Sequence, residues 1–197
     1  IAVLTVLAKG VGNKQGIQAA LAFDAYHEFG LVANAMEEVI AQKDYLQELT
    51  DIYLTDTPNA FYIGRGADYA VSLEAALKLK EISYIQAEGF AAGELKHGTI
   101  ALIETNTPVI GMISEQTTGA HTRGNLKEVE SRGAKTLIIA TQGLDKKDDQ
   151  LVLPIVHPLL TSLVMVIPTQ LIAYYATLLR GLDVDKPRNL AKSVTVE

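Results

Sequence analysis

The amino-acid sequence predicts an α/β fold in which a parallel sheet is flanked by helices. Short apolar runs, typical of buried strands, recur along the chain from residue 60 onward. They are separated by helical patterns of about a dozen residues or more, the connection length that parallel strands require. The first third of the chain has helical patterns only, so a helical segment is expected to precede the sheet.

The N-terminal elements are predicted to be helical. Ile1–Ala8 is apolar and has no N-cap before it, so we interpret it as the end of a helix, with a loop at Gly10–Gly16. Residues 17–52 place apolar side chains at helical spacing with acidic residues between them, which predicts one or two amphipathic helices.

A first strand is predicted at Ala60–Ile63, where an apolar run ends in the turn Gly64–Gly66. A charged helix follows this turn. The long apolar segment near the C-terminus contains Pro168 and Gln170, so it is interpreted as a buried helix in preference to a membrane span. The remaining elements are strands at Pro108–Ile113, Lys135–Ala140 and Leu151–Val156, a helix over 118–132, and the long helix over 159–180 that ends at Gly181.

The charged helix carries a charged strip, which we define as Glu74, Lys78 and Glu81. Their spacing of i, i+4 and i+7 places them on one helical face. Apolar residues border this strip on both sides, which indicates that the charges face a cleft. The alternative is a solvated face, because Glu74 to Lys78 is also the favourable order for an ordinary i, i+4 ion pair on an exposed helix.

His97 follows just beyond this helix, in a turn bounded by Gly93 and Gly98 that also contains Glu94 and Lys96. Histidine is the side chain that most readily exchanges protons near neutral pH. By itself, His97 is better explained as a capping or core residue than as a catalytic one.

Two runs carry a family resemblance: GRGADYAVSLEAALKLKEISYIQAEGFAAGELKHGTIALIETNTPVI and DKPRNLAKSVTVE. They closely resemble the C-terminal isomerase region of the glutamine–fructose-6-phosphate aminotransferase (glucosamine-6-phosphate synthase) family, which is built from two sugar isomerase (SIS) domains. The resemblance implies a flavodoxin-like SIS domain at 56–181. Residues 1–55 would be the helical end of the first SIS domain with a linker, and 182–197 a tail that closes over the sugar site.

The resemblance also implies an activity, the conversion of fructose 6-phosphate and ammonia to glucosamine 6-phosphate. Glu81 would be the proton-transfer base, His97 would assist ring opening, and Lys78 would set the charge around Glu81. Lys192 would engage the substrate carbonyl, and Ala191 and Lys192 would bind substrate. No cofactor is expected, because a 1,2-proton shift conserves oxidation state. The family builds its site across a homodimer, with His97 reaching the neighbouring subunit.

Two segments of that family are absent from the chain, the glutaminase domain and most of the first SIS domain with its Ser/Thr-rich phosphate loop. We therefore expect a fragment with little or no turnover alone. The alternatives are a non-catalytic SIS sugar-phosphate sensor, which needs an intact phosphate loop, and an SIS isomerase acting without amination. Gly64–Gly66 lacks the hydroxyls of such a loop, and those of Ser114–Gly119 are interpreted as helix N-caps.

Composition excludes several classes of function. A net charge of −6 gives no electrostatic footprint for nucleic acid or for an anionic membrane surface. The chain has no cysteine, and His27, His121 and His157 lack partners at ligand spacing, so no metal is predicted. His157, before Pro158, is interpreted as a structural hydrogen-bonding residue. The start IAVLTVLAKG lacks the basic region of a signal peptide, so a cytoplasmic location is expected.

Overall fold

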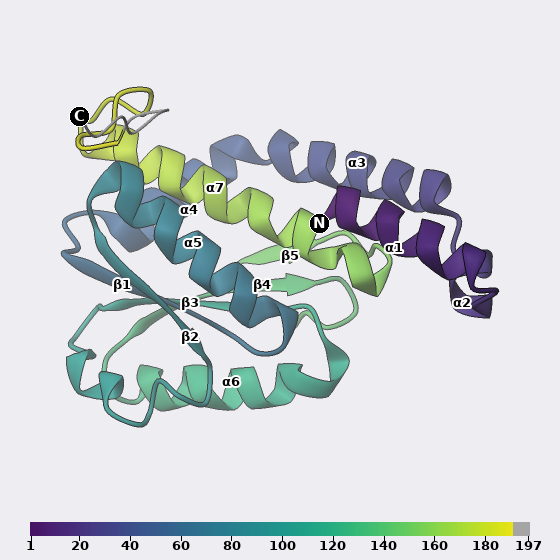
Figure 1. The fold of residues 1–197 in the computed structure, drawn as a ribbon. Coiled ribbons are helices and arrows are strands. Elements are labelled where there is room, and N and C mark those ends of the chain that lie inside the picture. Colours follow the sequence, from purple (N-terminus) through teal and green to yellow (C-terminus); the bar gives the residue numbers. More distant parts are fainter. Residues whose placement is uncertain (191–197) are drawn as a thin grey trace, which may run out of the picture.

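A computed structural model describes residues 1–190 of the chain and contains a five-stranded parallel sheet (Figure 1). The strand order is β2-β1-β3-β4-β5, which is the flavodoxin-like order of doubly wound sheets. All four neighbouring pairs are parallel. The strands are β1 (Asn59–Gly64), β2 (Gln86–Ala91), β3 (Pro108–Ile113), β4 (Lys135–Thr141) and β5 (Leu151–Leu153).

Helices cover both faces of this sheet (Figure 1). On one face lie α3, α4, α5 and α7, with α7 packed against the other three, while α6 covers the opposite face. The core accordingly has two apolar clusters, one on each side of the sheet. The bounds are α3 (Ala25–Ala41), α4 (Lys43–Leu54), α5 (Ala67–Ser83), α6 (Gln116–Glu130) and α7 (Thr161–Leu179), with 3-10 turns η1 (Thr99–Leu102) and η2 (Pro158–Leu160).

The predicted α/β fold is confirmed, and so are the four predicted strands, although β5 ends three residues early. One strand, β2, was not predicted. It contains Gly89, which is unfavourable in a strand interior, but the glycine is required by packing. A Cβ at Gly89 would lie 2.5 Å from the backbone oxygen of Ser72 on α5, so this position holds the helix close to the sheet.

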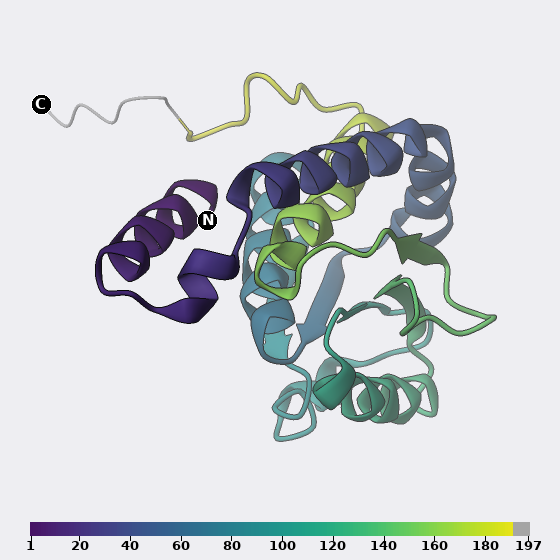
Figure 2. The ribbon, with the colours of Figure 1, turned by 90° about the vertical axis from the view of Figure 1, so that its right-hand side faces the viewer.

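The predicted loop at Gly10–Gly16 is wrong, because α1 (Ala2–Lys14) continues through most of it. Gly12 serves close packing within this helix: a Cβ there would lie 2.5 Å from Cβ of Ala20, in α2 (Gln18–Ala22). Figure 2 shows α1 and α2 as an arm beside the sheet and its covering helices. Most apolar side chains of α1 are exposed, including Val3, Leu4, Val6 and Leu7.

The long apolar helix α7 is a core element. With η2 it is long and apolar enough to cross a membrane, with a mean hydropathy of 1.6 over its most apolar stretch. Half of that stretch is buried, and Pro168 lies inside the helix at a buried position. This burial supports the interpretation as a buried helix of the domain.

Candidate active site

The charged strip of α5 forms one connected group of charges. Nζ of Lys78 lies 2.7 Å from Oε2 of Glu81 and 3.7 Å from Oε1 of Glu74. The Lys78 side chain is 33% exposed and the Glu81 side chain 28%, so the shorter pair is half-buried. The hydrogen bond to Glu81 raises the pKa of Lys78, and the charges of Glu81 and Glu74 raise it further, so this lysine is a cation at neutral pH.

Lys78 lies at the edge of a groove of about 390 Å³ between α3, α5 and α7. The groove is mainly apolar, and its lining includes Ile82 from α5, Tyr174 from α7 and Val184 from the segment after α7. The predicted cleft is therefore present beside one member of the strip. The two borders of the strip differ, because Ala75 is buried whereas Leu73 and Leu77 are exposed.

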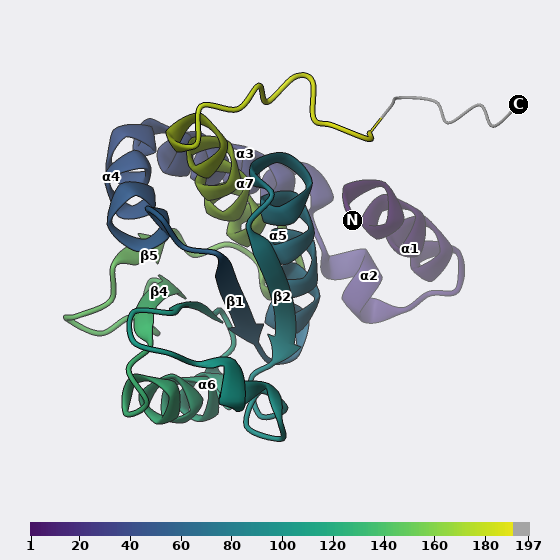
Figure 3. The ribbon, with the colours of Figure 1, turned by 90° about the vertical axis from the view of Figure 1, so that its left-hand side faces the viewer.

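The chain after α7 passes the C-terminal end of α5 (Figure 3). The backbone N–H of Arg188 donates to the Tyr84 hydroxyl at 2.7 Å, and the Arg188 guanidinium lies 4.0 Å from the Tyr84 ring centroid. The beginning of the tail is thus held near the charged strip. Ala191 and Lys192, the two predicted substrate-binding residues, lie outside the described residues, as do Val194 and Val196.

His97 does not lie beside the charged strip of the same chain. It lies in the predicted turn that Gly93 and Gly98 bound. After α5 ends at Ser83, strand β2 runs back along the sheet beside β1, and Ala91 pairs with Gly64 at the carboxyl ends of these strands. Glu81 lies 14 residues into α5, about 21 Å along the helix axis from its first residue. His97 is exposed in the turn after β2, near the beginning of α5. Within one chain, the structure therefore separates His97 from Glu81.

The crevice where doubly wound sheets bind ligands is filled by the protein itself. Such sheets bind ligands at the carboxyl ends of the strands where the order reverses, here the ends of β1 and β3. At this point the backbone N–H of Ala67 donates to Oε1 of Glu115 at 2.9 Å. Asp68 accepts hydrogen bonds from the Ser114 N–H at 2.8 Å and the Ser114 hydroxyl at 2.5 Å. Carboxylates of the chain thus occupy the start of α5, where an anion would bind.

Ser114, Gly66 and Asp68 have roles at this crevice that were not predicted from the sequence. Ser114 does not cap α6, since its hydroxyl donates to Asp68 and Glu115 is the N-cap position, without a side-chain capping bond. Gly66 has a φ of 59°, and a Cβ there would lie 2.5 Å from the Glu115 carboxylate. Asp68 is buried, and this burial raises the pKa of its carboxyl despite the hydrogen bonds from Ser114. From the sequence, Asp68 can be recognised only as an acidic residue in the first turn of a helix, where a negative charge interacts favourably with the helix dipole.

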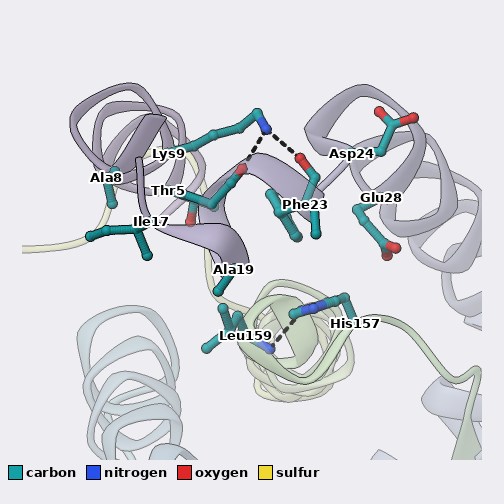
Figure 4. Close-up of a pocket in the computed structure, with 13 residues that line it drawn as sticks. Thr5, Ala8, Lys9, Ile17, Ala19, Phe23, Asp24, Glu28, His157 and Leu159 are labelled. Carbon is teal, nitrogen blue, oxygen red and sulfur yellow. Dashed lines mark hydrogen bonds between the residues drawn. The ribbon is translucent and has the colours of Figure 1, made fainter. Parts of the chain in front are cut away.

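A cavity of about 570 Å³ lies away from the charged strip, between the arm and the start of α7 (Figure 4). Nζ of Lys9 donates to the carbonyl oxygen of Ala20 at 2.8 Å and to that of Phe23. The ammonium group therefore satisfies carbonyl oxygens at the C-terminal end of α2. Nδ1 of His157 accepts a hydrogen bond from the N–H of Leu159 at 3.3 Å. This confirms His157 as a structural hydrogen-bonding residue. Within residues 1–190, no group of three acidic, histidine or cysteine side chains is arranged to hold a metal ion.

Sequence comparison gives close relatives over the whole chain. It is 61% identical over 198 residues to a glutamine–fructose-6-phosphate aminotransferase (isomerizing) of Streptococcus agalactiae, and 59% identical over 197 residues to one of Streptococcus pneumoniae. All of this chain is covered in both cases. It spans 33% of the length of each relative.

Structural comparison agrees with this likeness. The C-terminal domain of glucosamine-fructose-6-phosphate aminotransferase from Francisella tularensis has a TM-score of 0.74 at 31% identity, covering 88% of this chain and 48% of that one. A glucosamine-6-phosphate deaminase from Thermotoga maritima has a TM-score of 0.71 at 24% identity, covering 91% and 52%, and shares the fold. The SIS domain family matches residues 53–180, which include the sheet, the charged strip and the filled crevice. The chain therefore belongs to the SIS domain family.

Proposed function

We propose that this chain is part of the isomerase region of a glutamine–fructose-6-phosphate aminotransferase. It would help convert fructose 6-phosphate and ammonia to glucosamine 6-phosphate in the cytoplasm. The observation that carries the proposal is the half-buried Lys78–Glu81 pair at 2.7 Å, beside a groove, in a chain 61% identical to such an enzyme. The chain spans a third of its relatives' length, so ammonia release and phosphate binding would belong to other segments.

The reaction needs a group that moves a proton between C1 and C2 of the opened sugar. Glu81 is suited to this role, because its carboxylate is partly exposed at the helix surface and has one oxygen held by Lys78. Lys78 would orient that carboxylate and set the charge around it, and its cationic charge would favour the enolate that develops. Lys192 would engage the carbonyl, and Ala191 would contact the sugar with it.

The position of His97 supports a site shared between two copies of the chain. Within one copy it is separated from Glu81 by the length of the sheet. A homodimer in which His97 of one copy approaches Glu81 of the other would allow it to assist ring opening. In this arrangement residues 1–55 would complete a preceding SIS domain, 56–181 would form the second, and 182–197 would close over the sugar.

A sugar-phosphate sensor is the competing function, and it requires an open phosphate site in the SIS domain. The crevice between β1 and β3 is instead filled by Glu115 and Asp68, which favours the enzyme. The third possibility, isomerisation without amination, is disfavoured by the 61% identity to an aminotransferase.

The test is calorimetric binding of fructose 6-phosphate and glucose 6-phosphate, together with glucosamine 6-phosphate formation from ammonium. Both would be measured for the 197-residue chain and for a longer chain that includes the upstream SIS domain of the Streptococcus agalactiae relative. We expect binding and turnover in the longer chain only. Glu81→Gln and Lys192→Ala should abolish or weaken turnover, whereas Glu74→Gln, a matched change on the same strip, should have little effect. Tight binding by the short chain that is indifferent to Lys192 would instead support a sensor.

A further inference from the structure

The turn after β2 carries His97, whose side chain is exposed. The position of the imidazole therefore depends on the backbone of this turn. Two backbone hydrogen bonds close it: the N–H of Glu94 donates to the Ala91 carbonyl at 2.7 Å, and the N–H of His97 donates to the Glu94 carbonyl at 3.0 Å. Leu95 is buried in the apolar cluster on the α6 side of the sheet. The turn is thus anchored at its base and in its middle.

Arg65, directly after β1, makes a further contact with this turn. A Cβ on Gly93 would lie 2.6 Å from Nη2 of Arg65, so the absence of a side chain at Gly93 leaves room for the guanidinium against the turn. The same Nη2 donates to Oδ1 of Asn125 on α6 at 3.2 Å. The amide of Asn125 is itself oriented, because its Nδ2 donates to Oε2 of Glu128 at 3.2 Å. The guanidinium therefore bridges the turn and α6.

The surroundings of Arg65 do not favour it on grounds of stability. Its Nε is buried and makes no hydrogen bond within the part of the chain that the structure describes, and an unsatisfied buried donor is destabilising. The ion pairs among residues 1–190 involve Lys78 and Arg123, so the half-buried guanidinium of Arg65 has no carboxylate partner there. A polar group kept under such conditions calls for an explanation in function.

We infer that Arg65 is a positioning residue, which holds the turn at Gly93 so that His97 is presented in one orientation to the sugar site of a second copy. It would touch no substrate and would act through His97. This inference rests on the proposed function, in which His97 assists ring opening. Ring opening breaks the bond between C2 and the ring oxygen; the 2-hydroxyl loses its proton as the carbonyl forms, and the ring oxygen gains one.

The first test is amide hydrogen exchange of the 197-residue chain without sugar. Arg65→Met removes the guanidinium and keeps an unbranched side chain, so we expect the His97 amide to exchange about tenfold faster. The Ile110 amide, in the buried strand β3, should change less. Arg132→Met, at an exposed position just after α6, is the matched control and should change neither amide. An unchanged His97 amide in Arg65→Met, or equal acceleration of both amides, would overturn the inference.

The second test compares two substrates in the longer chain described above, with ammonium as the nitrogen source. Fructose 6-phosphate must be opened, whereas 5-deoxyfructose 6-phosphate lacks the hydroxyl that closes the ring and is already open. His97→Ala and Arg65→Met should each lower kcat/KM for fructose 6-phosphate by about tenfold and leave that for the open substrate unchanged. Arg65→Met should have no further effect in the His97→Ala background, and losses that multiply there would overturn the inference.

Gly93→Ala provides a second variant that keeps the guanidinium. Its Cβ would displace only the flexible end of Arg65, so the chain should fold normally and lose the same activity. If His97→Ala distinguishes the two substrates but Arg65→Met and Gly93→Ala do not, the inference is wrong and the proposed function stands. If His97→Ala itself fails to distinguish them, the proposed role of His97 is wrong, and that of Arg65 with it.

Discussion

The ion pair between Arg123 on α6 and Asp149, in the loop between β4 and β5, allows a quantitative prediction. The guanidinium of Arg123 contacts both carboxylate oxygens, at 2.7 and 2.6 Å, and also donates to the Leu144 carbonyl at 2.7 Å. The side chains are 11% and 2% exposed, so this pair is desolvated, unlike the charged strip. Replacing Asp149 by Asn leaves the guanidinium buried without a counter-charge, which costs about 3 to 5 kcal/mol in comparable buried pairs. Because the amide oxygen still accepts a hydrogen bond, we expect about 3 kcal/mol.

The effect should depend on pH in a direction set by the pKa of Asp149. Burial alone would raise this pKa, but hydrogen bonds from Arg123 and from the Lys146 N–H lower it below its usual value. The unfolded chain therefore binds the proton more readily, so the stabilisation is complete above the unfolded-state pKa of about 4 and is lost as the pH falls through the folded-state value.

Urea unfolding followed by circular dichroism, at pH 7, 5 and 3, would measure both effects. The difference between wild type and Asp149→Asn should stay constant from pH 7 to 5 and shrink at pH 3. Asp148→Asn, an exposed neighbour, should change the unfolding free energy by less than about 0.5 kcal/mol. A loss below about 1 kcal/mol at pH 7, or a difference that does not shrink in acid, would refute the reasoning.

Three further predictions concern stability and are checked by the same unfolding measurement. Glu81→Gln should cost less than about 1 kcal/mol, because the Lys78 pair is partly exposed, and a loss above about 2 kcal/mol would mean that the strip is structural. Gly89→Ala should lower the free energy of unfolding by about 1 to 3 kcal/mol, because the new Cβ meets the Ser72 backbone. Gly124→Ala, in open space on α6, should leave that free energy unchanged or raise it. Equal changes in the two variants would contradict the role of Gly89 in packing. Glu115→Ala should cost about 0.5 to 2 kcal/mol by freeing the Ala67 N–H, and no change would mean that this contact adds nothing.

The sequence predicted the features that depend on local pattern. The strand Pro108–Ile113 was predicted with its observed bounds, because it is an uninterrupted apolar run that is buried along its whole length. Glycine was a poor guide to local structure where tertiary packing requires it. The sequence predicts a loop at Gly12, but this residue lies inside α1. Gly89 is unfavourable in a strand, so β2 was not predicted. Both glycines are present because they allow a close approach between elements.

In the candidate site, too, features that depend on local spacing were predicted and features that depend on tertiary contacts were not. The placement of Glu74, Lys78 and Glu81 on one helical face follows from helical spacing, and the contacts of Lys78 with both carboxylates agree with it. The contact between Tyr84 and Arg188 joins residues 104 apart and leaves no local signal. The separation of His97 from Glu81 within one chain depends on β2, which was not predicted and which carries the chain to the carboxyl ends of the strands.

The filled crevice between β1 and β3 has a consequence for the binding of anionic compounds. Because Glu115 is attached to the fold, its effective concentration at the start of α5 is set by the loop that carries it and is of millimolar order or higher. A phosphate-bearing compound that competes for this position must displace a tethered carboxylate as well as lose its own hydration. The start of α5 would therefore be a poor binding position for such a compound. The groove beside Lys78 and the tail segment at Tyr84 offer the more accessible surface.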